Sequence, residues 1–114
     1  MIRKLNKRDE ASVLSYLYQE PGFNIFIIGD IETFGFEKDF QRIYADIDKD
    51  NNYLSVFLRY RENAIYYSHN NNFNKEYLSI FKKDSFQYIS GKTEMMEKIE
   101  DYVSNNKKSQ MHFC

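Results

Sequence analysis

Apolar side chains recur along this chain at two spacings, whose succession predicts the order of its helices and strands. Recurrence every three to four residues indicates a helix with one buried side, whereas alternation of apolar and polar residues indicates a half-buried strand. Helices are predicted over residues 7–19, 25–34, 75–83 and 93–104, and strands over residues 2–5, 41–48, 53–61, 64–68 and 86–90. The predicted order is β-α-α-β-β-β-α-β-α, and residues 105–114 form either a loose tail or the start of a closing strand.

Local signals predict where the first two helices begin and end. Asn6 is a good N-cap, and Asp9 three residues later completes a capping box for the first helix. Pro21–Gly22 predicts the end of that helix. Asn24 predicts the N-cap of the second helix, and Gly35 predicts the residue that stops it.

The second helix has one apolar side and one mixed side. A rotation of 100° per residue brings together four apolar side chains that we expect to face the sheet: Ile27, Ile28, Ile31 and Phe34. Gly29, Asp30 and Thr33 fall on the other side, and Phe26 lies among them. We expect Phe26 and Asp30 to meet a partner or a ligand from this second side.

The strand pattern predicts a mixed sheet of the α/β class with helices on both faces. Strands 41–48, 53–61 and 64–68 are separated by short polar turns, which is typical of an antiparallel meander. Phe57 lies opposite the apolar face of its strand, so both sides of that strand should be covered. The helix between strands 64–68 and 86–90 predicts a parallel crossover.

Composition narrows the class of protein. The 114 residues suit one domain, and the 16 basic and 17 acidic residues give a net charge of −1 and no basic footprint for a nucleic acid. The single Cys114 excludes an internal disulfide. No signal peptide is recognisable, and no apolar run approaches the roughly 20 residues of a membrane span. We therefore expect a cytoplasmic protein that binds neither nucleic acid nor membrane.

Residues that support metal binding or nucleophilic catalysis are few and scattered. His69 and His112 are far apart in the chain and Cys114 is terminal, so they lack the spacing of metal ligands. Ser68 and His69 are adjacent, and adjacent residues of a strand point to opposite faces. The sequence therefore predicts neither a metal site nor a Ser–His catalytic pair.

Acidic residues accompany the second helix. Asp30 and Glu32 are two positions apart and do not share a helix face, and Glu20 lies just upstream. The simpler interpretation is a solvated helix edge. The alternative is that one of these carboxylates holds an amine-bearing substrate or acts as a general base.

The turn that follows strand 64–68 is the natural place for a phosphate cradle, because a helix begins after it. Such a cradle uses glycines to bring backbone N–H groups close to a pyrophosphate. Residues 69–74 read HNNNFN and contain neither glycine nor arginine. A pyrophosphate site is therefore not expected here.

The element order and the stretch YLYQEPGFNIFIIGDIETFGF, residues 16–36, resemble the GNAT-type N-acetyltransferase superfamily. More specifically, this stretch is similar to the N-terminal region of a group of two-domain bacterial, mostly Firmicute-type, GNAT proteins. In that group the N-terminal half is a degenerate acetyltransferase-like domain and the C-terminal half carries the acetyl-CoA signature. Residues 58–60, 66–68 and 90–92 fit the same resemblance.

The resemblance implies a GNAT-like domain without the machinery of an acetyltransferase. The acetyl-CoA motif of the superfamily, Q/R-x-x-G-x-G/A, follows the fourth strand, and residues 68–75 do not match it. Neither a cofactor-binding residue nor the Tyr general acid of the family can be carried over. We therefore expect an N-terminal domain that is inactive alone, holds no cofactor, and packs against a catalytic C-terminal half or a second copy.

Two alternatives remain. One is a small active N-acetyltransferase in which the backbone of residues 66–68 holds the acetyl arm of acetyl-CoA. The other is a small-ligand or regulatory module with a pocket near Asn24, Asp30 and Tyr66. The candidate substrate or interface residues are Phe26, Asp30, Tyr66, Tyr67 and Ser68.

Overall fold

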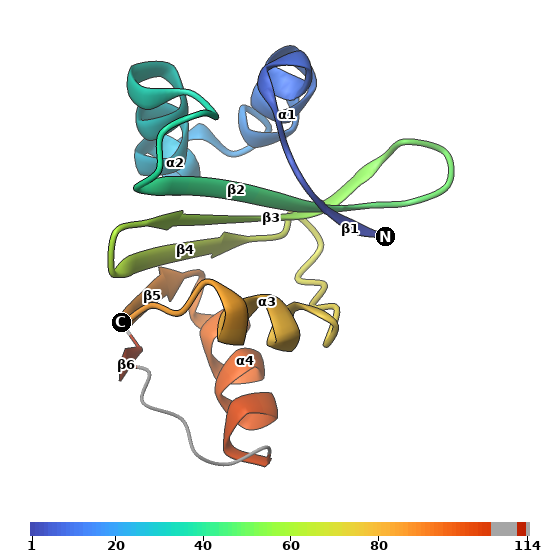
Figure 1. Ribbon diagram of the computed structural model, residues 1–114. Coiled ribbons are helices and arrows are strands. Elements are labelled where there is room, and N and C mark those ends of the chain that lie inside the picture. Colours follow the sequence, from blue (N-terminus) through green and yellow to red (C-terminus); the bar gives the residue numbers. More distant parts are fainter. Residues whose placement is uncertain (106–111, 114) are drawn as a thin grey trace.

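The computed structural model describes residues 1–105 and 112–113 and confirms the predicted order of elements (Figure 1). Its strands are β1 (Ile2–Lys4), β2 (Gln41–Ile47), β3 (Tyr53–Tyr60), β4 (Asn63–Tyr67), β5 (Tyr88–Gly91) and β6 (His112–Phe113). Its helices are α1 (Glu10–Leu17), α2 (Pro21–Phe34), α3 (Tyr77–Lys83) and α4 (Thr93–Asn105), with a 3-10 turn at Lys7–Asp9. The closing strand is therefore present as β6, whereas the rest of the predicted tail beyond Asn105 lies outside the described residues.

The strands form one mixed sheet in the order β1-β2-β3-β4-β5-β6. β1 to β4 pair antiparallel, which confirms the predicted meander. β4 pairs with β5 in parallel, as the intervening helix predicts, and β5 pairs with β6 in parallel. The carboxyl ends of β4 and β5 consequently lie side by side, which is where ligands commonly bind in parallel sheets.

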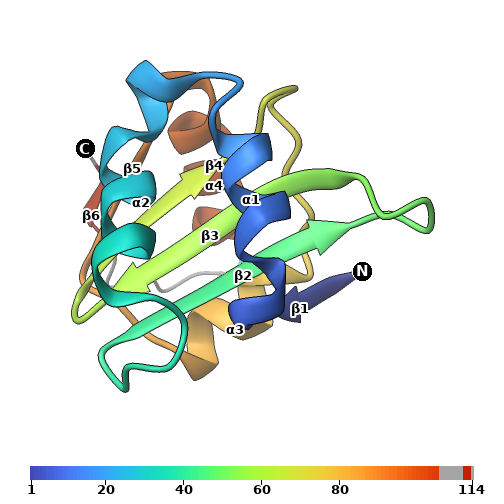
Figure 2. The same cartoon turned by 90° about the horizontal axis from the view of Figure 1, so that it is seen from above.

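Helices cover both faces of the sheet, as Figures 1 and 2 show: α1 and α2 lie on one face, and α3 and α4 lie on the other. β3 explains this arrangement, because Val56 and Leu58 are buried under α1 and α2 while Phe57 is buried under α3 and α4. The core beneath α1 and α2 is rich in Ile, Val and Leu. The core beneath α3 and α4 is rich in Tyr, Phe and Met.

The capping box at the start of the first helical segment is confirmed. Asn6 Oδ1 accepts a hydrogen bond from Arg8 N at 2.8 Å, and Asp9 Oδ2 accepts one from Asn6 N at 2.9 Å. Arg3 pairs with the same Asp9 carboxylate at 2.8 Å and ties the segment to β1. The capped segment is a 3-10 turn, so α1 itself begins at Glu10 and ends at Leu17, two residues before the predicted end.

The predicted start of the second helix is wrong, because Pro21–Gly22 opens α2 and does not merely end α1. Proline is tolerated in the first turn of a helix, where its missing N–H would have no partner in any case. Asn24 therefore lies inside the helix and is fully buried, with its Nδ2 donating to Leu17 O at 2.9 Å. That bond joins the start of α2 to the end of α1.

At the other end of α2, Gly35 is confirmed as the stop. It has φ +70°, and its N–H donates to Ile31 O at 2.9 Å. Ile27, Ile28 and Ile31 face the sheet as predicted. Phe34 is only half-buried and packs against the rings of Phe40 and Tyr60, and Tyr60 is a partly buried residue at the edge of that core.

Within the described residues, no helix combines the length and the apolar character needed to cross a membrane. The same residues contain no group of three or more His, Cys, Asp or Glu side chains placed to hold a metal ion.

Candidate functional site

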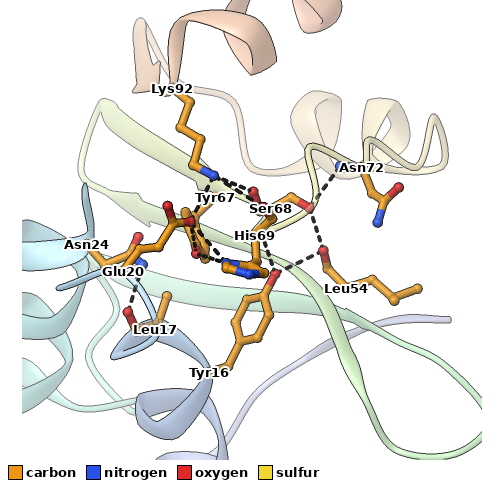
Figure 3. Close-up of polar contacts among 10 residues, drawn as sticks. All are labelled: Tyr16, Leu17, Glu20, Asn24, Leu54, Tyr67, Ser68, His69, Asn72 and Lys92. Atoms are coloured by element: carbon orange, nitrogen blue, oxygen red, sulfur yellow. Dashed lines mark hydrogen bonds and ion pairs between the residues drawn. The ribbon is translucent and has the colours of Figure 1, made fainter. Parts of the chain in front are cut away.

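A polar network centred on Glu20 lies at the carboxyl ends of β4 and β5 (Figure 3). Glu20 is the residue before α2, and its carboxylate does not cap that helix. Instead, Oε1 accepts hydrogen bonds from Tyr67 OH at 2.5 Å and from Lys92 Nζ at 2.9 Å. His69 Nδ1 lies 3.2 Å from the same oxygen. One carboxylate oxygen thus joins residues from the ends of two strands.

Lys92 fills the space where β4 and β5 separate. Its side chain is only 9% exposed, and Nζ donates to Ser68 O at 3.2 Å and to His69 O at 3.4 Å as well as to Glu20. The ammonium also lies 5.0 Å from the ring centre of Tyr67 and 5.4 Å from that of Phe23. Two carbonyls, a carboxylate and two aromatic rings therefore compensate the charge that burial takes from water.

The backbone of Gly91 permits this approach. Tyr66 and Gly91 form the last pair of the parallel register, and Lys92 follows immediately. A Cβ on Gly91 would lie 2.5 Å from Tyr66 O and 2.9 Å from Met96 Cε. Glycine is therefore needed where β5 turns into α4 against β4.

The network sets the protonation states of Glu20 and Tyr67. The hydrogen bond from Tyr67, followed by those from Lys92 and His69, lowers the pKa of Glu20 to about 2. Burial and the neighbouring Glu20 carboxylate raise the pKa of the Tyr67 hydroxyl. At neutral pH the site therefore holds a carboxylate and a neutral phenol that donates to it.

This arrangement also orients His69. The Tyr67 hydroxyl uses its hydrogen in the bond to Glu20, so the Tyr67 oxygen, 3.3 Å from His69 Nδ1, is free to accept a hydrogen bond from that nitrogen. The tautomer with the proton on Nδ1 satisfies both neighbours, and it leaves Nε2 as a proton acceptor. A carboxylate-oriented imidazole of this kind can accept a hydrogen bond from a ligand or act as a base.

A second set of hydrogen bonds anchors the loop after β4. Tyr16 OH donates to Leu54 O at 3.1 Å and accepts from His69 N at 2.9 Å. Ser68 Oγ donates to the same carbonyl at 2.8 Å and accepts from Asn72 N at 2.8 Å. The Ser68 hydroxyl is therefore committed to the backbone and does not bond to His69.

The predicted site residues occupy three different places. Tyr67 and Ser68 belong to the network. Tyr66 points to the opposite face, where its hydroxyl donates to Asn72 O at 2.7 Å and its ring packs between α3 and β4. Phe26 is 74% exposed on the outside of α2. Asp30 is half-buried further along α2, and burial raises the pKa of its carboxyl.

Three residues at the centre of the network, Glu20, His69 and Lys92, are missing from the predicted site residues, although Glu20 is one of the carboxylates considered for an amine or a base. A sequence signal for two of them exists, since His69 directly follows one of two strands predicted to be parallel and Lys92 follows the other after a single glycine. Parallel neighbours end at the same edge of a sheet, so the residues after them meet. Glu20 carries no comparable signal, because its direction depends on the start of α2.

A pocket of about 440 Å³ adjoins the network on the α1 side. Its wall is formed by α1 and the residues just after it, by the turn between β2 and β3, and by the loop after β4. Tyr16 and His69 belong both to this wall and to the anchoring bonds just described. The network is therefore accessible to a small molecule from this side.

The chain has no significant match among protein-family models, curated proteins or solved structures.

Proposed function

We propose that this chain is a GNAT-like domain that does not transfer acetyl groups by itself and that packs against a partner, either a catalytic half or a second copy. The observation that carries the proposal is the position of the Lys92 ammonium at the carboxyl ends of β4 and β5. In the alternative of a small active acetyltransferase, the backbone of residues 66–68 would hold the acetyl arm. In this chain Lys92 already bonds to Ser68 O there.

Backbone N–H groups in the loop after β4 offer further support. His69 N donates to Tyr16 OH, Asn71 N donates to Ser68 O at 3.3 Å, and Asn72 N donates to Ser68 Oγ. A pyrophosphate would need free amides in this loop, because amides that converge on the anion are what bind it. These three amides are already committed within the protein.

The outer side of α2 supplies the surface for the partner. Phe23 and Ile25 are 61% and 63% exposed, and Phe26 is more exposed still. Contiguous apolar exposure of this kind is typical of a protein interaction site. The Phe23 ring also contacts the Lys92 ammonium, so this surface continues to the carboxyl ends of β4 and β5.

Calorimetric titration with acetyl-CoA tests the absence of cofactor binding. We expect no heat of binding at micromolar concentrations for the wild-type chain, because the space between the strand ends is filled. Lys92→Ala, which removes the side chain between the strand ends, should also fail to bind acetyl-CoA, because the backbone amides of the loop remain hydrogen-bonded within the protein. Micromolar binding by the wild-type chain would contradict the proposal and favour the active acetyltransferase.

A further inference from the structure

We infer that the pocket between α1, the β2–β3 turn and the loop after β4 binds a small uncharged ring that carries hydroxyl groups. Monosaccharides and nucleosides share this chemistry. The pocket lies in a different part of the surface from the exposed side of α2. The inference therefore does not depend on the proposed partner. The pocket is named the tyrosine pocket below, after Tyr16 and Tyr53 in its wall.

The lining of the tyrosine pocket is polar but contains no acidic residue, lysine or arginine. α1 and its C-terminal extension contribute Ser12, Tyr16 and Gln19, which recur at helical spacing and so share one face. Asn52 and His69 come from the two loops opposite. None of the described lining residues is Asp, Glu, Lys or Arg, although 29% of the chain is charged. A ligand with a net charge would therefore find no counter-charge in this wall.

The two tyrosines form a fixed aromatic wall. Their ring centres are 5.6 Å apart with an angle of 24° between the ring planes, which is a stacked arrangement. Tyr16 OH is bonded to Leu54 O and His69 N, and Tyr53 OH lies 2.8 Å from Ser12 Oγ. Because the protein already satisfies both hydroxyls, the rings are held in place before a ligand arrives. A preorganised apolar ring beside neutral polar groups suits the C–H face of a sugar ring.

His69 gives the tyrosine pocket a directed acceptor. Glu20 and Tyr67 engage its Nδ1 at 3.2 and 3.3 Å, and no described residue forms a hydrogen bond with Nε2. With the proton on Nδ1, Nε2 can accept a hydrogen bond from a ligand hydroxyl. The amide of Gln19, which is exposed on the same wall, can both donate and accept. These groups match the pattern of a small-molecule site, in which an apolar surface carries a few fixed polar groups.

The experiment is an NMR titration of the isotope-labelled wild-type chain with methyl glucoside and with adenosine, each at millimolar concentration. We expect one of the two to shift the amide signals of Gln19, Asn52 and His69, and the identity of that compound separates the two sources. Glucose 6-phosphate and adenosine monophosphate are the charged counterparts. They should bind no more tightly than the uncharged forms, because the wall contains neither lysine nor arginine.

Gln19→Ala and His69→Gln should each weaken the binding about fivefold, the effect of losing one hydrogen bond. Gln87→Ala is the matched control, since Gln87 is an exposed amide outside the pocket, and it should leave the affinity unchanged. Gln19 is also exposed, so its variant keeps the test valid if His69→Gln disturbs the fold. The inference is overturned if none of the four compounds shifts these signals. Tighter binding of a phosphorylated form, or wild-type affinity in both pocket variants, would also overturn it.

Discussion

α2 and α4 cover opposite faces of the same sheet, but their outer sides differ. Inward, both are apolar: Ile27 and Ile31 of α2 and Met95 and Ile99 of α4 are almost fully buried. Outward, α4 is charged, with exposed Glu94, Glu97, Lys98, Glu100 and Asp101. Outward, α2 presents Phe23, Ile25 and Phe26.

The difference identifies which helix is the outermost layer. A helix between a sheet and water is normally apolar on one side only, as α4 is. A helix that is apolar on several sides is normally covered on several sides. Among the described residues, α4 therefore has the surface of an outer helix, whereas the apolar outer side of α2 is the feature on which the proposed partner rests.

The same two helices are joined at their starts. Glu20 directly precedes α2, Lys92 directly precedes α4, and the two side chains form an ion pair at 2.9 Å. The pair crosses the carboxyl ends of β4 and β5, so it links the layers on the two faces. Three pairs of variants test the inner sides, this link and the outer sides in turn.

The largest effect should come from the inner sides, where the two helices are alike. Ile31→Ala in α2 and Ile99→Ala in α4 should each lower the free energy of unfolding by about 2–5 kcal/mol, because each leaves a cavity in a packed core. Both side chains are at most 1% exposed. Chemical denaturation measures both. A loss below about 1 kcal/mol for either variant would show that its helix is loosely packed against the sheet.

An intermediate effect should come from the link. The folded-state pKa of Glu20 is lowered from 4.5 to about 2, so its contribution to stability is fully present above pH 4.5 and is lost as the pH falls toward 2. Wild type should therefore have a higher melting temperature than Glu20→Gln at pH 7, and the difference should shrink as the pH approaches 2. Melting curves across this range measure it. Other carboxylates with lowered pKa values, such as Asp9 and Asp48, are present in both proteins. Their contribution therefore cancels in the difference between the two melting temperatures.

Lys92→Met is the partner variant for the link. Without the ammonium, the pKa of Glu20 should rise toward its ordinary value, so acid destabilisation through this group should begin at higher pH. A pH-independent difference between wild type and Glu20→Gln would contradict the role assigned to the ion pair.

The smallest effect on stability should come from the outer sides, where the helices differ. Phe26→Ser and Glu97→Ser should each change the free energy of unfolding by about 0.5 kcal/mol or less, because both side chains are exposed. Only Phe26→Ser should reduce the binding of a hydrophobic fluorescent dye and weaken any concentration-dependent association in sedimentation. If the two variants behave alike in both measurements, α2 has no special outer surface.

Much of the fold follows from local pattern. The capping box at Asn6 and Asp9 and the stop at Gly35 are read from the sequence and are confirmed, because each depends on backbone geometry within a few residues. The exception is Pro21–Gly22, which local rules allow both as a helix stop and as a helix start. In the structure Pro21–Gly22 starts a helix, and the hydrogen bond from Asn24 to Leu17 O accompanies this start.

The sequence by itself determined the elements, their order and the two-sided apolar character of β3. It also placed Tyr67 and Ser68 at the end of a strand. The tertiary structure decided that these residues meet Glu20 and Lys92, which are 47 and 24 positions away from Tyr67 and Ser68 respectively. The predicted parallel pairing brings Lys92 near the end of β4, but spacing along the chain carries no information about the contact with Glu20, because that contact depends on the angle at which α2 leaves α1. For the exposed side of α2, the pattern placed Phe26 away from the sheet, but only packing shows that Phe23 and Ile25 are uncovered as well.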